Sequence, residues 1–89
     1  MSTTELAGIG LKAIEYKDAV DARRDAAFEF DAACSKWKEG NGVSFIERGS
    51  EAWNQMLGAV AGEIETVKKA KAAERNTRER LFRAVRRAA

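Results

Sequence analysis

The sequence contains no histidine and no proline, and its single cysteine is Cys34. Without histidine, the chain lacks the commonest general base and a common metal ligand. One cysteine alone provides neither a zinc site nor a thiol–imidazole pair, and it cannot form an intramolecular disulfide. No glycine-rich phosphate loop of the usual spacing occurs. We therefore expect a protein that is not an enzyme and that holds neither a metal nor a cofactor.

Long apolar runs are also missing from the sequence. No segment approaches the roughly 18 apolar residues that a membrane-spanning helix needs. The first residues, Met1–Glu5, lack the basic start and apolar core of a signal peptide. A single cysteine is typical of proteins in a reducing compartment. These features predict a cytoplasmic protein without a membrane partner.

What the sequence has in abundance is alanine and charge. Charged residues make up 34% of the chain, and hydrophobic residues, many of them alanine, make up 45%. With proline absent, this composition favours an all-α protein. A chain of 89 residues forms one domain. A domain this small is only marginally stable unless disulfides, a metal ion or oligomerisation stabilise it. We expect self-association, as a dimer that forms a helical bundle or as a higher oligomer.

The turn is predicted at Gly40–Val43, which contains the only Gly-Asn-Gly of the chain. Glycine and asparagine tolerate the left-handed backbone that ends a helix. Ser44 and Glu47, three residues apart, have the spacing of a capping box at the start of the next helix. The sequence therefore predicts an antiparallel helical hairpin, with helices at about residues 3–39 and 44–87.

The first predicted helix carries an apolar stripe at alternating spacings of three and four, as in a coiled coil. Ser2 with Glu5, or Thr3 or Thr4 alone, can cap its start. Only Arg23 breaks the apolar character of the stripe, and several aspartates lie off it. The predicted stripe consists of Leu6, Ile9, Ala13, Tyr16, Val20, Arg23, Ala27, Phe30, Cys34 and Trp37.

The second helix is expected to pair with the first from the turn outward. This register brings Arg23 within about a turn of Glu63, so Arg23 is either an outward-reaching side chain or one half of an interhelical pair. It also leaves residues 80–89 beyond the start of the first helix. The expected stripe of the second helix is Ile46, Ser50, Trp53, Leu57, Val60, Ile64 and Val67, continuing through Lys71, Glu74 and Arg78 to Leu81 and Val85.

Two local features leave alternatives open. Asn76 and Glu79 form a second capping-box pattern, which would break the chain near residues 76–77 and begin a short helix at about 77–88. Trp37 and Trp53 flank the turn on the predicted stripes. They either clamp the closed end of the hairpin or form an aromatic hot spot for a partner.

Charge is divided unevenly along the chain. Residues 1–65 carry 7 Lys/Arg and 12 Asp/Glu, whereas residues 66–89 carry 9 and 2. The basic segment can complement its own helix dipole while packing in an oligomer, bind phosphates, or dock on an acidic protein surface. Its candidate partner-binding residues are Lys68, Lys71, Arg75, Arg78, Arg80, Arg83, Arg86 and Arg87.

These observations predict a non-enzymatic protein–protein interaction module. A small nucleic-acid-associated protein, acting through the basic helix, is the alternative. No aromatic stacking set accompanies the arginines, so any nucleic-acid contact is expected to involve phosphates rather than bases. Small size without catalytic residues is also a property of phage-encoded inhibitors and adaptors, anti-defence proteins included, and that class stays open.

Overall fold

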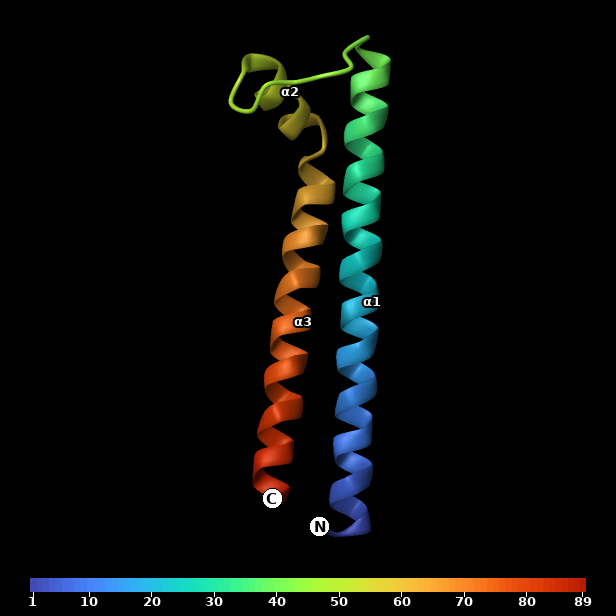
Figure 1. Cartoon of the computed structure of the whole chain (residues 1–89), viewed down its shortest axis with the longest axis vertical. Helices are drawn as coiled ribbons and strands as arrows, with labels where there is room; N and C mark the ends of the chain where they lie inside the picture. Colours follow the sequence, from blue (N-terminus) through green and yellow to red (C-terminus); the bar gives the residue numbers. More distant parts are fainter.

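The computed structural model describes residues 1–89 and consists of three helices without strands. They are α1 (Thr3–Gly40), α2 (Glu51–Ala59) and α3 (Ala61–Ala88). The long helices α1 and α3 lie side by side and run in opposite directions, while α2 sits at the closed end (Figure 1). The predicted all-α hairpin is confirmed. It is a rod of 60 × 19 × 17 Å.

Helix α1 begins and ends with signals that are local in sequence. The hydroxyl of Ser2 accepts a hydrogen bond from the Glu5 amide at 3.0 Å, and the Ser2 amide donates to Glu5 Oε1 at 3.3 Å. This is the predicted capping box. At the other end the Gly42 amide donates to the Glu39 carbonyl, and the Val43 amide donates to the Lys38 carbonyl. These two bonds form a Schellman motif around Gly42, whose φ is +66°.

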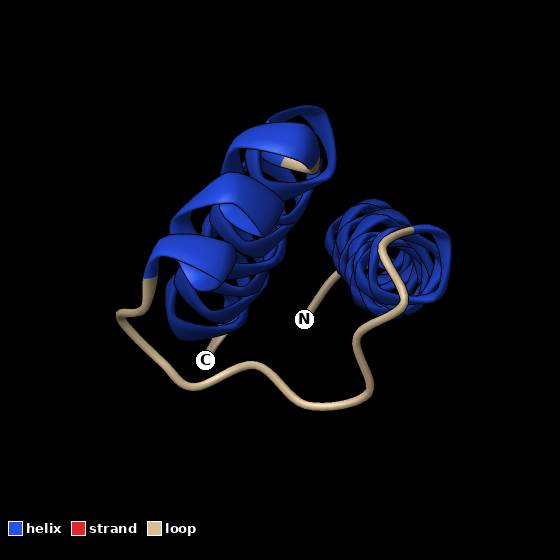
Figure 2. Ribbon diagram, turned by 90° about the horizontal axis from the view of Figure 1, so that it is seen from above, coloured by secondary structure: helices blue, strands red, loops and turns tan.

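The connection after α1 is longer than the predicted turn. The second helix begins at Glu51 rather than near residue 44, because Ser50 is its N-cap and accepts a hydrogen bond from the Trp53 amide at 3.2 Å. Ser44 and Glu47 lie in the loop and form no capping box. Gly49, with φ of +84°, lets the chain turn into Ser50. Figure 2 looks onto the closed end and shows this loop passing from α1 to α2.

The break in the second half of the hairpin falls at Val60 rather than near residues 76–77. Val60 separates α2 from α3 with φ of −106° and ψ of 22°. Helix α3 continues through Asn76 and Glu79 without interruption. Beside them Thr77 is buried, and its hydroxyl donates to the Ala73 carbonyl at 2.8 Å. That bond satisfies the hydroxyl inside the helix, so Thr77 packs at the seam without ending α3.

The seam between α1 and α3 has the predicted alternating spacings of three and four residues. At every second position of α1, however, the seam residue lies one position earlier in the sequence than predicted. Ala19 and Ala26 are buried, whereas Val20 and Ala27 are only partly so. Alanine allows the two backbones to approach closely, which a larger residue such as Val20 would oppose at the position of Ala19. The seam of α1 is formed by Ile9, Lys12, Tyr16, Ala19, Arg23, Ala26, Phe30, Ala33 and Trp37, and that of α3 by Glu63, Val67, Ala70, Glu74, Thr77, Leu81, Ala84 and Ala88.

The register of the hairpin is set by an ion pair between Arg23 and Glu74. Of the two alternatives for Arg23, the structure contains the interhelical pair, but its partner is Glu74 rather than Glu63, because the loop and α2 take up the residues next to the turn. Residues 80–89 are therefore not an overhang. They lie against the first turns of α1, and the two termini meet at the same end of the rod (Figure 1).

Candidate partner-binding surfaces

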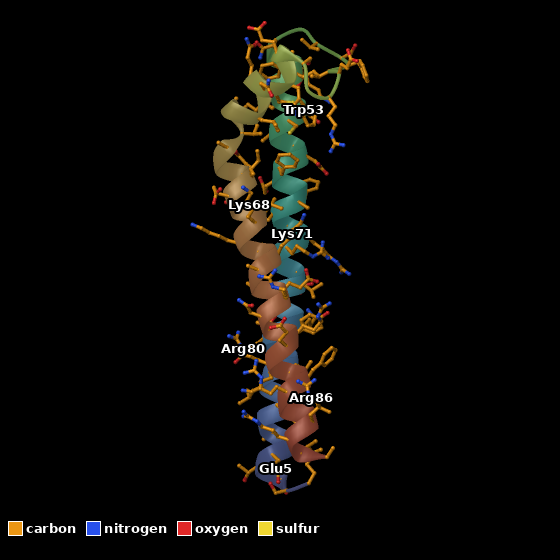
Figure 3. All side chains as sticks on the ribbon, turned by 90° about the vertical axis from the view of Figure 1, so that its left-hand side faces the viewer. Glu5, Trp53, Lys68, Lys71, Arg80 and Arg86 are labelled. Carbon is orange, nitrogen blue, oxygen red and sulfur yellow. The ribbon has the colours of Figure 1, made fainter.

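All eight candidate partner-binding cations of the C-terminal segment are exposed on α3. Figure 3 shows Lys68, Lys71, Arg80 and Arg86 distributed along α3. Three ion pairs occur in the whole structure, and only one involves this group, a 3.7 Å contact between Lys68 and Glu65. The other seven cations have no carboxylate within bonding distance, so their charge faces solvent.

Three of these cations converge with a residue that the sequence analysis did not select. Arg80, Arg83 and Arg87 line a hollow of about 140 Å³ at the open end of the hairpin, together with Ala84 and Lys12 of α1. Lys12 is partly buried at the seam. Its spacing of three from Ile9 and four from Tyr16 is the sequence signal that could have placed it there. We call Lys12, Arg80, Arg83 and Arg87 the cation cradle.

A second hollow lies midway along the hairpin. It measures about 270 Å³ and is lined by Phe30, Ile64, Val67, Lys68 and Lys71. Three of the lining residues are apolar, and the other two are lysines that were predicted to bind partners.

The two tryptophans lie on different helices, Trp37 on α1 and Trp53 on α2. Trp37 of α1 lines a hollow of about 270 Å³ with Val60 and Glu63. Trp53 is on α2, and the Arg48 guanidinium carbon lies 5.9 Å from its ring centroid, in a cation–π contact. Both indoles are partly buried at the closed end. The clamp at the closed end and the aromatic hot spot for a partner both stay predictions.

Glu63 lies at the closed end and influences Cys34 instead of Arg23. Burial is the main cause that raises the pKa of the Cys34 thiol, and the Asp31 carboxylate raises it further. Lys38 lowers this pKa, and Glu63 makes the smallest contribution, which raises it. A thiol with a raised pKa is a weak nucleophile at neutral pH. Cys34 is partly buried beside Ala33 of the seam.

The side of α1 that faces away from α3 carries a second stripe with the same three–four spacing. Ile14 and Arg23 are nine residues apart, which places them on opposite sides of the helix. Asp21 is held by Lys17 at 2.7 Å, and this hydrogen bond lowers the pKa of the Asp21 carboxyl. We call this set the back stripe; it consists of Leu11, Ile14, Asp18, Asp21, Asp25 and Phe28.

No family model matches the chain, and no curated protein or solved structure is significantly similar to it. No group of three or more potential metal ligands occurs in the structure. None of the helices combines the length and apolar character that crossing a membrane would require. The surfaces described above are therefore the basis on which a function is proposed.

Proposed function

We propose that this chain is a non-enzymatic protein–protein interaction module. The observation that carries the proposal is the surface that the hairpin leaves uncovered. The accessible area is 6504 Å², whereas a compact monomer of this mass exposes about 5,200 Å². The excess of about 1,300 Å² is larger than the roughly 800 Å² that each partner buries in a standard interface. A reducing compartment, the cytoplasm, suits its single thiol.

The uncovered surface includes large apolar side chains in an ordered arrangement. Leu11, Ile14 and Phe28 of the back stripe are 63%, 57% and 71% exposed, and only five of the 89 residues are buried. Apolar groups gathered along one exposed helix face mark a site of interaction. Covering the back stripe would add the apolar burial that two helices alone do not provide.

A second copy of the chain is the partner that we favour, because its charges complement the back stripe. Three aspartates occupy the middle of that stripe. One flank of α3 carries cations around an exposed aromatic ring, at Lys68, Arg75, Phe82 and Arg86. In a two-fold symmetric dimer, the back stripe of each copy would meet this flank of the other. The result is a four-helix arrangement. A different protein with an acidic, apolar surface could use the same flank.

The experiment that tests self-association is sedimentation equilibrium over a range of protein concentrations. We expect a dimer for the wild type and a shift to monomer for Ile14→Glu, which places a charge in the back stripe. Ala13→Glu is the matched control: the position is exposed on the same helix, about 100° around the axis from Ile14, and the variant should remain dimeric. Circular dichroism verifies that both variants stay helical. A wild type that is monomeric at all concentrations would contradict self-association.

Association with nucleic acid is the second candidate, and the unpaired cations of α3 favour it. The test is fluorescence anisotropy of labelled DNA and RNA at about 50 and 200 mM salt, because each phosphate contact steepens the loss of affinity with salt. The variant that reverses Arg80, Arg83 and Arg87 to glutamate should abolish binding. Truncation after residue 67 is a poor test, since it removes most of α3 and with it the seam. No binding at low salt would exclude this function.

A further inference from the structure

Two cations occupy the seam of α1, and only one of them has a carboxylate partner. Arg23 is paired with Glu74 across the helices. Lys12 is partly buried at the same kind of position and has no ion pair. The residues that line the hollow beside it are Arg80, Arg83, Ala84 and Arg87. Lys12 therefore lies between the helices beside three other cations, and packing alone does not explain why four positive charges are placed together.

The cation cradle brings positive charges from two helices, α1 and α3, to the same hollow. Arg80, Arg83 and Arg87 are three and four residues apart, so they lie on one face of α3, and the register of the hairpin places Lys12 opposite them. No acidic side chain lines the hollow; Glu15, one turn along α1, is not part of it. Like charges gathered in this way repel one another, and an anion bound among them removes that cost.

We propose that the cation cradle is a binding site for a phosphate group. One guanidinium group can donate two hydrogen bonds to a phosphate group, while a lysine ammonium contributes a compact positive charge. A phosphate offers several acceptor oxygens and close to two negative charges, which suits four converging cations better than a single carboxylate does. Inorganic oligophosphates and nucleic-acid backbones both present this chemistry. The site does not rest on the self-association proposed above, because it uses a different face of α3.

The cation cradle exists only when α1 and α3 pack together, so an isolated basic C-terminal segment would not form it. Its members come from the start of α1 and the end of α3, which the seam holds side by side. Phe82 lies about 200° around the helix from Arg80, and Val85 the same angle from Arg83, so the apolar flank at this end faces away from the site. Binding should therefore depend on Lys12, which is 68 positions from Arg80 in sequence.

The test compares variants that each replace one cation with glutamine and so remove one positive charge, either inside the cradle or outside it. Binding of tripolyphosphate is measured by calorimetry, and binding of a 20-nucleotide DNA by anisotropy, both at about 50 mM salt. Lys12→Gln and Arg80→Gln are expected to weaken binding by about tenfold each, since each removes a charge-assisted contact. Their controls are Lys17→Gln, at an exposed residue of α1, and Arg78→Gln, about 200° around α3 from Arg80. The controls should change affinity by much less.

The outcomes separate the sources of the phosphate and can overturn the site. Tight binding of tripolyphosphate that is lost in Lys12→Gln identifies a small phosphate ligand. Binding of DNA alone, with the same loss, identifies a backbone phosphate. Equal effects of Lys12→Gln and Lys17→Gln would show that net charge alone is sensed and would overturn the cradle, even if the arginine reversal still abolished DNA binding. Absence of binding by both ligands would overturn it as well. Lys12→Arg should retain affinity.

Discussion

Arg23 and Glu74 form the only ion pair that joins the two long helices. The other two ion pairs lie within α1 and within α3. The Arg23 and Glu74 side chains are 32% and 23% exposed, so water reaches them only in part. An ion pair between the two helices at seam positions favours one register over alternatives shifted by a heptad. Alanine is the commonest residue of the seam, and its small side chain distinguishes those registers only weakly through apolar contacts.

Removing one partner of this pair should destabilise the hairpin. Arg23→Ala leaves Glu74 partly buried without its cation, and we expect a loss of about 1–2 kcal/mol, between the values for exposed and fully buried pairs. Urea unfolding measures the loss. The double variant Arg23→Met/Glu74→Leu should recover most of it. Glu63→Gln, at the residue that the predicted turn would place near Arg23, should change stability by less than about 0.5 kcal/mol; a large effect there would contradict the register.

The alanines of the seam should not tolerate a larger side chain. Ala26 is 6% exposed, and Ala26→Leu would force the helices apart at a cost of about 1–3 kcal/mol. Ala27→Leu is the matched control, because Ala27 is only partly buried at the edge of the seam. Thermal unfolding of the two variants provides the comparison. Greater destabilisation by Ala27→Leu would restore the stripe predicted from sequence.

Helix α2 should depend on the hydroxyl of Ser50. Its oxygen accepts from the Trp53 amide, and Ser50→Ala should cost about 1 kcal/mol because that amide loses its partner. Ser44→Ala removes the same hydroxyl from a loop position and should be nearly neutral. Urea unfolding monitored by tryptophan fluorescence can compare them. If both variants lost the same stability, the start of α2 would lie elsewhere.

The thiol of Cys34 should react slowly, and its reaction should require high pH. Burial and the carboxylates of Asp31 and Glu63 raise the Cys34 pKa, so alkylation by iodoacetamide should follow a pH profile displaced upward from that of a free thiol. The raised pKa also makes stability depend on pH. Because the thiol of the unfolded chain ionises at a lower pH than that of the folded chain, the contribution of Cys34 to the free energy of unfolding is complete below the unfolded pKa and is lost as pH rises through the folded pKa. Asp31→Asn should move the alkylation profile downward by more than Glu63→Gln does, whereas Glu39→Gln should not move it.

The sequence predicts the helices well because their signals are local. The heptad spacing, the Ser2–Glu5 capping box and the stop at Gly42 all arise within a few residues of where they act. The start of α2 was missed because two serines precede apolar residues, at 44 and 50, and the spacing rule favours the first. Only the left-handed backbone of Gly49 places the second serine at the cap.

The pairing of the helices was predicted less well, because it depends on what lies between them. Val20 and Cys34 are larger than the alanines that precede them and, together with Ala27, suggested one phase of the stripe, while close packing favours the alanines one position earlier. The register was displaced because the residues next to the turn were assigned to the seam. That displacement made the last residues look like an overhang, and it hid Lys12 from the set of candidate binding residues.

The hairpin is held at one end by a loop and a kinked helix, and both termini lie at the other end (Figure 1). A group bound by both Lys12 and the arginines would therefore join the two long helices at the end where no loop connects them. Dyes attached near the two termini would report a change in the distance between these ends as a change in energy transfer.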